Sequence, residues 1–152
     1  VNGEDVKTTN IIKIKNGTGN TFNITATSAW SMVEIPLKMQ IFKIGNKLSF
    51  NSSKNAIIIG EGISKVLVTA RINIYNAPGN IQVNLRICKN GNFDESKYDE
   101  CVEVLSGLND FSVSNMPMEV EEGDEITLRL LAGDAGNYVL LNSCTCLIVQ
   151  EL

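Results

Sequence analysis

The amino-acid sequence predicts an all-β domain, folded as a sandwich or a barrel of short strands. Apolar residues recur with a period of two in short segments, and turns rich in Gly, Asn and Asp interrupt these segments about every 8–15 residues. Helices are not expected, because no long stretch of the chain carries an apolar period of 3.6 residues. Strands without helices must cover their apolar faces with other strands, which favours these two architectures.

The clearest alternation lies in two consecutive segments, 65–76 and 81–91, joined by a turn that contains Pro78 and Gly79. Each segment places apolar residues on one face and mostly polar residues on the other, which is typical of a strand with one buried face. We therefore predict that these two strands form the centre of the core. The residues expected to face it are Val66, Val68, Ala70, Ile72, Ile74, Ile81, Val83, Leu85 and Ile87.

Shorter apolar segments predict the other strands. Pro36 is expected to bend the segment 32–44 or to place it at a sheet edge, because proline cannot donate to a ladder. A tight turn is expected at 121–124, where Gly123 can adopt a positive φ. The remaining expected strands lie at 11–15, 21–26, 48–51, 56–60, 101–105, 111–114, 126–131, 138–141 and 145–152.

The length of 152 residues corresponds to one domain with a single core. Residues 1–10 are mostly polar and are interpreted as an N-terminal arm or linker, and residues 11–152 as the domain. The chain begins with Val1, so a segment upstream of the arm is conceivable.

The composition excludes several classes of function. The net charge of −4 argues against a nucleic-acid partner, which would need a basic surface. The chain contains no histidine, so the common catalytic triads, His-ligated zinc and the usual general base near neutral pH are ruled out. No apolar run approaches the roughly 20 residues needed to span a bilayer, so membrane insertion is not expected. We predict no enzymatic activity, no cofactor and no metal.

Four segments are apolar on both faces, at 56–60, 128–132, 138–141 and 146–149. Strands with one face in water should alternate, so continuous apolar runs indicate cover on both sides. This pattern favours packing against another subunit. The alternative is that the runs are strand ends tucked under loops.

The four cysteines allow several states. Cys88 and Cys101 bracket a hydrophilic loop and are candidates for a hairpin disulfide, whereas Cys144 and Cys146 are badly spaced to bond each other. Free thiols are favoured for the latter pair, and the former pair stays open. A four-cysteine zinc site is disfavoured because the chain has no C-x₂-C spacing.

The hydrophilic loop 89–100 is the candidate ligand contact. It combines aromatic, amide and carboxylate side chains, which is the usual make-up of a carbohydrate site and also of a loop anchored by an aromatic residue. Its acidic residues lack the spacing of an EF-hand, so a solvated surface is favoured over a Ca²⁺ site. Trp30 is expected in the core or in an interface. The candidate binding residues are Asn90, Asn92, Phe93, Asp94 and Tyr98.

Three segments in order resemble the trimeric jelly roll shared by the complement globular head domain and tumour necrosis factor. They are NLRICKNG at 84–91, EVEEGDEITLRL at 119–130, and the closing NSCTCLIV at 142–149. The N-terminal part, with IGEGISKVLVTARI, looks like small domains of this fold in bacteriophage head fibres, decoration proteins and tail tips.

This resemblance implies an antiparallel jelly-roll β-sandwich of about ten strands that assembles as a homotrimer. It further implies a non-enzymatic virion or surface protein that acts in attachment or assembly. The implied partners are a capsid, shaft or stalk protein and a cell-surface glycan, and the implied location is virion or extracellular. The alternative is a secreted bacterial or animal ligand or carbohydrate-binding head of the same fold.

Overall fold

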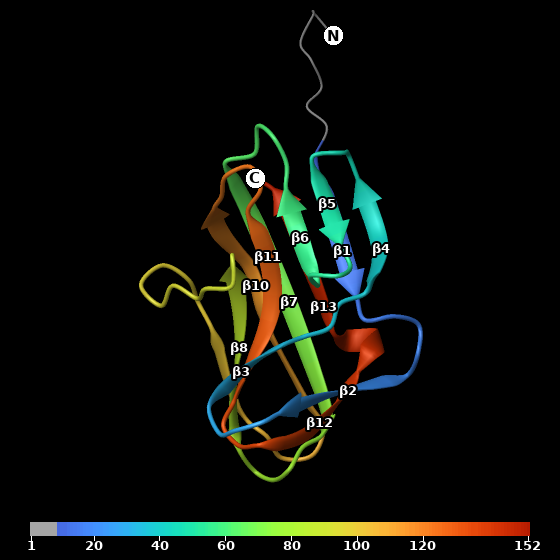
Figure 1. Ribbon diagram of the computed structural model, residues 1–152, viewed down its shortest axis with the longest axis vertical. Helices are drawn as coiled ribbons and strands as arrows, with labels where there is room; N and C mark the ends of the chain where they lie inside the picture. The colour runs from blue at the N-terminus through green and yellow to red at the C-terminus, as the bar shows by residue number, and fades with distance from the viewer. Residues whose placement is uncertain (1–8) are drawn as a thin grey trace, which may run out of the picture.

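The computed structural model, which describes residues 9–152, shows two antiparallel β-sheets packed face to face (Figure 1). The 3₁₀ helix η1 (Asn142–Cys144) is a short link between two strands. The described strands are β1 (Ile11–Lys15), β2 (Thr21–Ala26), β3 (Ser31–Glu34), β4 (Met39–Ile44), β5 (Leu48–Asn51), β6 (Ala56–Ile59), β7 (Lys65–Asn76), β8 (Gln82–Lys89), β9 (Cys101–Val104), β10 (Asn109–Glu119), β11 (Glu125–Ala132), β12 (Gly136–Leu141) and β13 (Cys146–Glu151).

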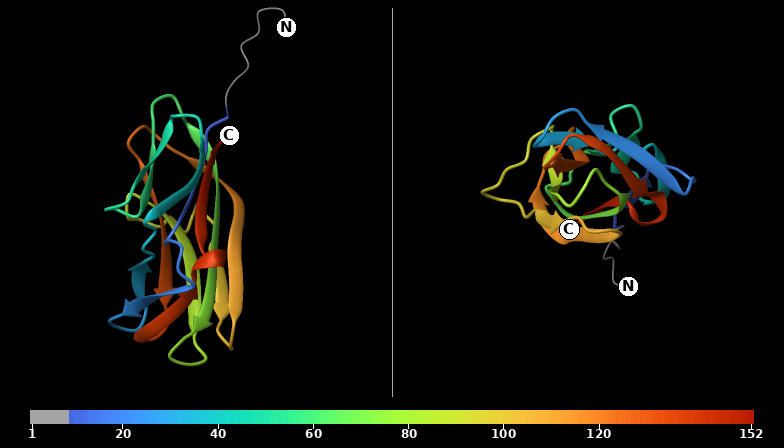
Figure 2. Two further views of the ribbon diagram at one scale, coloured as in Figure 1. Left: turned by 90° about the vertical axis from the view of Figure 1, so that its right-hand side faces the viewer. Right: turned by 90° about the horizontal axis from the view of Figure 1, so that it is seen from below.

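The sheets are closely similar in size. The seven-stranded sheet runs β2-β12-β7-β13-β1-β4, and β10 pairs with the other edge of β7. The six-stranded sheet runs β5-β6-β11-β8-β9, and β3 pairs with β11 along the same edge as β6, further along the strand. Figure 2 shows the layers edge-on and from below. Strands β9 and β10 therefore form one lateral edge of the sandwich, and β4 and β5 form the other.

Strand β7 organises the larger sheet because it pairs with three strands. Along one edge it pairs with β10, and along the other it pairs first with β13 and then with β12. The fully buried Thr145 occupies the place where these two partners separate. Its hydroxyl accepts a hydrogen bond from the Asn73 N–H (3.2 Å) and donates one to the Leu141 carbonyl (2.8 Å). Thr145 thus satisfies backbone groups that the interrupted ladder would leave unpaired.

The core confirms the alternation predicted for the two central strands. The residues predicted to face inward on β7 are fully buried, as are Val83, Leu85 and Ile87 on β8, while Ile81 lies just before β8 and is half-buried. The structure contains more strands than the roughly ten expected from the jelly-roll pattern. One reason is Pro36, which ends β3 and separates it from β4, so that the segment 32–44 contributes to both sheets.

Strand β10 is longer than its sequence pattern predicted. Phe111 and Val113 face the core, but the next buried residues are Met116 and Met118, so the period of two is broken. The register shifts between Val113 and Met116, where Asn115 has a φ of 50°. The β-bulge inserts one extra residue, so odd-numbered residues face the core before it and even-numbered residues face the core after it. The period of two is therefore interrupted, and the sequence pattern predicted only the first half of the strand.

The two ends of the described chain lie at the same end of the sandwich (Figure 1). Asn10 is buried, its side chain donates to Glu151 (2.7 Å), and its carbonyl accepts from the Glu151 N–H (2.8 Å). Asn10 is therefore part of the folded domain, although it was assigned to the arm. Residues 1–8 of the predicted arm lie outside the described residues.

The apolar runs interpreted as a subunit contact are largely covered within the chain. Their outward members, such as Ile58, Leu131 and Ile148, are half-buried. The large apolar side chains with the highest exposure lie elsewhere, mainly on β4, on β9 and in turns. The subunit contact predicted from these runs therefore stays a prediction, and the side chains most open to a partner are on other segments.

We expect Thr145→Val to lower the free energy of unfolding by about 1–3 kcal/mol, because it leaves the Asn73 N–H and the Leu141 carbonyl buried without a partner. Thr145→Ser keeps the hydroxyl and serves as the control. Urea unfolding followed by circular dichroism measures both. Equal losses for the two variants would mean that the methyl group, not the hydroxyl, holds the junction.

Candidate functional site

The loop 89–100 projects from the flank of the sandwich rather than from either end (Figure 1, yellow). It starts with a tight turn in which Asn90 and Gly91 have φ of 53° and 80°, and Lys89 and Asn92 form an isolated bridge. Asparagine and glycine are the residues that adopt this left-handed conformation most readily. The sequence Lys-Asn-Gly thus fixes how the chain leaves β8.

Arg86 on β8 anchors the middle of the loop. Its Nε lies 2.5 Å from a carboxylate oxygen of Glu100, and its guanidinium lies 4.5 Å from the ring centre of Phe93. The more exposed Glu95 lies 3.6 Å from the same guanidinium. Phe93 is half-buried, so this ring stabilises the loop and is not a free stacking surface.

Two of the other candidate residues hold the loop together. The side chain of Asn90 donates to Asp124 (2.8 Å) and accepts from the Glu125 N–H (2.9 Å), which ties the loop to the turn before β11. The carboxylate of Asp94 accepts from the hydroxyl (2.6 Å) and the N–H (3.0 Å) of Ser96. These hydrogen bonds stabilise the charged carboxylate and hold the pKa of Asp94 below its usual value.

Asn92 and Tyr98 complete the candidate set. Asn92 is exposed, and its side-chain amide donates to the Asn90 carbonyl (3.2 Å). Tyr98 is half-buried, packs partly against the core, and has the Lys89 ammonium 5.9 Å from its ring centre. Loop 89–100 therefore brings all five candidates together, but mainly as an anchored turn.

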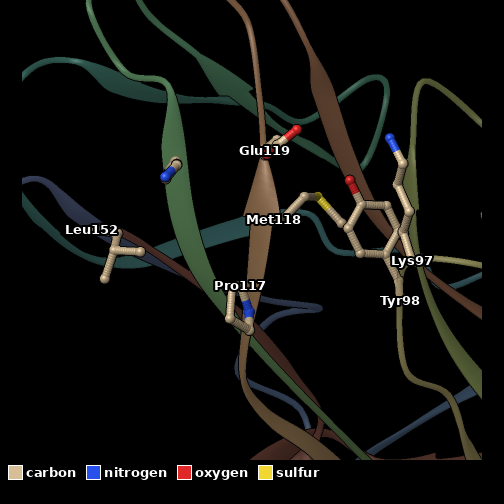
Figure 3. Close-up of a pocket in the computed structure, with 7 residues that line it drawn as sticks. Lys97, Tyr98, Pro117, Met118, Glu119 and Leu152 are labelled. Carbon is tan, nitrogen blue, oxygen red and sulfur yellow. The ribbon is translucent and has the colours of Figure 1, made fainter.

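Tyr98 nevertheless lines one wall of a surface pocket of about 470 Å³ (Figure 3). Lys97 stands beside Tyr98 on that wall, and Pro117 and Glu119 come from β10. Lys65 of β7, which pairs with Glu119, also lines the pocket. No ion pair or side-chain hydrogen bond of Lys65 or Lys97 is found in the part of the chain that the structure describes. The pocket thus combines a partly open aromatic ring, two ammonium groups and one carboxylate.

Sequence reasoning found only one side of this pocket. Tyr98 was predicted as a ligand contact. Lys65, Pro117 and Glu119 come from two strands that are distant in the sequence, and the apolar pattern of these strands predicts only which residues are buried. No local motif joins these positions. Only the pairing of β7 with β10, which sets Lys65 opposite Glu119, brings them together.

The acidic residues of the turn at 121–124 and of the loop 89–100 have partners in the fold. Asp124 accepts from the Glu121 N–H (2.8 Å) and Gly123 has a φ of 88°, which confirms the predicted tight turn. In the loop, Arg86 pairs with Glu100 and lies near the exposed Glu95. Among the residues with a described position, no three His, Cys, Asp or Glu side chains come together as metal ligands.

The four cysteines are free thiols, so the candidate disulfide between Cys88 and Cys101 is not formed. The strand register gives the reason: Cys101 lies opposite Leu85, whereas Cys88 lies opposite Thr127 on the other neighbouring strand. Three residues along a strand separate the two cysteines by about 10 Å, too far for a disulfide. Burial also raises the pKa of the Cys88 and Cys146 thiols, which disfavours the thiolate that metals bind.

Two apolar surfaces are exposed on opposite edges of the sandwich. The β9 patch consists of Val102, Val104 and Leu108, with exposures of 50%, 59% and 61%. On the other edge, every residue of β4 is exposed. The β4 patch consists of Met39, Ile41, Phe42 and Ile44.

Trp30 is also exposed, so it lies outside the core, and the other expected place, an interface, stays a prediction. It belongs to the turn between β2 and β3, where the chain crosses from one sheet to the other. Over residues 9–152, the structure has no helix of the length and apolarity that crossing a membrane requires.

The sequence matches no protein-family model and no curated protein. Solved structures match it closely in shape. Murine APRIL has a TM-score of 0.69 at 12% identity, with 95% of this chain and 99% of that chain covered. The Eiger TNF of S. frugiperda has a TM-score of 0.63 at 10% identity, covering 96% and 94%. Pika GITRL has a TM-score of 0.52 at 15% identity, covering 96% and 97%.

The chain is thus an antiparallel jelly-roll sandwich. More narrowly, its fold is that of the tumour-necrosis-factor ligands, which confirms the resemblance stated from the sequence. The likeness extends over nearly the whole chain, including the N-terminal strands that the three resembling segments did not cover.

We expect Arg86→Met to expose loop 89–100 to proteases, because the ion pair with Glu100 and the contact with Phe93 are both lost. The rate of tryptic cleavage after Lys97 should rise about tenfold, which corresponds to about 1.4 kcal/mol of local stability. Mass spectrometry of a digestion time course measures it. Lys54→Met, which removes an exposed ion pair with Glu125 instead, is the control.

An unchanged rate after Lys97 in Arg86→Met would contradict the anchoring role of Arg86.

Proposed function

We propose that this protein is a non-enzymatic homotrimeric head that mediates attachment or assembly on a virion or in the extracellular space. The observation that carries the proposal is the pair of exposed apolar patches on opposite edges of the sandwich. Neither patch can be covered by the other within one chain. Exposed apolar surface of this kind marks a contact with another protein.

Two different patches on opposite edges favour a ring. If the β9 patch of one copy packs on the β4 patch of the next, each copy uses both patches. When the rotation between copies closes the ring, every patch in the ring is covered. A two-fold dimer would bury the same patch on both copies and leave the second patch in water. The proposed number of three comes from the jelly-roll fold, whose complement-head and tumour-necrosis-factor forms are trimers.

The proposed ligand contact is loop 89–100 together with the pocket that Tyr98 lines. Its volume of about 470 Å³ is in the range of small-molecule sites and accommodates one or two sugar rings. Two lysines that have no side-chain partner among residues 9–152 and one glutamate suit a glycan with an acidic group and several hydroxyls. Three copies on one ring would bind repeated surface glycans with avidity.

A secreted ligand for a cell-surface receptor is the second candidate. It is favoured by the coverage of whole chains: 99% of murine APRIL and 94% of the Eiger domain align with this chain. The two candidates share the trimer and differ in the partner, either a capsid or shaft protein and a glycan, or a receptor. Pull-down with purified shaft or stalk protein separates them.

We expect light scattering after size-exclusion chromatography to give three times the chain mass of 16.6 kDa. Val104→Lys on the β9 patch and Phe42→Lys on the β4 patch should each give monomers, because a charge in either patch breaks every contact of the ring. Glu61→Gln, an exposed site with the same change in net charge, should stay trimeric.

A mixture of the two lysine variants should give a heterodimer, because each partner keeps one intact patch and only one contact can form. A monomeric wild type at micromolar concentration, or trimers that persist in both variants, would contradict the ring.

We expect Lys97→Ala to weaken binding of 3′-sialyllactose by about tenfold, because it removes one of the two unpaired ammonium groups of the pocket. Titration calorimetry measures the affinity, with lactose as the neutral comparison. Lys97 is exposed, so the variant should fold normally, and Lys54→Ala is the matched control. Equal binding of both sugars would contradict an acid-binding pocket.

A further inference from the structure

The single tryptophan of the chain occupies an unusual place. Trp30 ends the turn between β2 and β3, at the end of the sandwich opposite to the one where Asn10 and Glu151 meet (Figure 1). Its side chain is 55% exposed. The ring of a large aromatic residue is usually buried, which removes its apolar surface from water. More than half of the surface of Trp30 stays in contact with water.

The backbone of Trp30 is strained. Its φ of 58° lies in the left-handed region, which bulky residues rarely adopt. The other non-glycine residues with positive φ are asparagines, which tolerate this conformation. A glycine at position 30 would relieve the strain, so a stable turn does not by itself need tryptophan there. Strain that persists at an exposed residue points to a role other than folding.

The turn nevertheless holds the ring in one position. The Trp30 N–H donates to the Ala132 carbonyl at 2.6 Å, which ties the turn to the end of β11. A Cβ on Gly133 would lie 3.4 Å from Cη2 of the indole and would collide with the Gln82 carbonyl. The indole therefore rests against the backbone of the β11–β12 turn with one side supported. A rigid platform of this kind loses little entropy when a ligand binds.

The segments that adjoin Trp30 expose polar side chains. Thr27, Ser28, Gln82 and Asp134 are exposed on the adjoining turns and strand. Among the described residues of the β2–β3 and β11–β12 turns, Trp30 is the only large apolar side chain that is exposed. A protein interface buries clusters of apolar side chains, as the β4 and β9 patches offer. One aromatic face among hydroxyl, amide and carboxylate groups is instead complementary to a sugar, whose C–H face stacks while its hydroxyls form hydrogen bonds.

We propose that Trp30 is the stacking platform of a second carbohydrate site, which takes a neutral pyranose ring of a surface glycan. Asp134 accepts hydrogen bonds from hydroxyl groups and would repel an acidic sugar, which sets this site apart from the lysine-lined pocket beside Tyr98. The site lies at the end remote from the chain termini. It does not rest on the acid-binding pocket.

The test uses the wild-type protein on an array of neutral glycans, together with Trp30→Gly, Trp30→Phe and Tyr75→Ala. Wild type should bind at least one galactose-, glucose- or mannose-terminated glycan. Trp30→Gly should lose that binding at least tenfold, and Trp30→Phe should lose less. Tyr75, which is 59% exposed and lies near the end of β7, is the matched aromatic control and should bind normally.

Two further readouts separate binding from folding. The melting temperature of Trp30→Gly should rise by about 2–6 °C, because the strained φ is relieved while no core residue is lost. Since the chain has one tryptophan, its fluorescence should shift saturably with the glycan found on the array and not with mannitol, an open-chain polyol.

Three results would overturn the proposal. The first is a wild type that binds no neutral glycan, and the second is undiminished binding by Trp30→Gly. The third is a melting temperature that falls in Trp30→Gly together with loss of the oligomer in light scattering, because another copy would then cover the indole. The last result leaves the acid-binding pocket untouched, and failure of 3′-sialyllactose binding leaves the Trp30 site untouched.

Discussion

The architecture depends on the pairing of β7 along both of its edges. Twelve residues of one strand keep an apolar face toward the core while β10 covers one edge and two successive strands share the other. The sheet branches at this point, and a branch exposes backbone groups that no strand can reach. Thr145 supplies the missing partners with a single hydroxyl. The pocket beside β7 and β10 and the β4 patch lie on this sheet, whereas the flank loop and the β9 patch belong to the other sheet.

The fold was predictable from the sequence where burial alone decides the pattern. The alternation in β7 and β8 needs no knowledge of other elements, since each inward residue meets the same apolar environment. Prediction from the sequence was poorer where the pairing of two strands determines which residues lie opposite each other. The bulge at Asn115 concealed half of β10, and the register that sets Cys101 opposite Leu85 excluded a disulfide that spacing alone allowed. Register is a property of two strands, and one sequence segment does not reveal it.

The candidate site shows the same division. The composition of loop 89–100 indicated an aromatic residue among amides and carboxylates, and the structure brings these groups together. The sequence did not predict whether each side chain is available to a ligand. Asn90 donates a hydrogen bond to Asp124, and Phe93 packs against Arg86, and both of these partners lie outside the loop. Trp30 lies outside the core for a related reason. Its apolar character predicts burial in the core or in an interface, and a positive φ beside a glycine turn places it at the surface of the chain.

The adjacency of the chain ends has a mechanical consequence. β1 and β13 are antiparallel neighbours whose outer ends lie at one pole of the sandwich. Tension applied to both ends would break the hydrogen bonds between these two strands one after another. Tension between the N-terminal end and a ligand bound at the opposite pole would instead act along β1. The hydrogen bonds on both edges of β1 would then bear the force at the same time. The domain is therefore expected to resist a pull between one end and the opposite pole better than a pull between its own two ends.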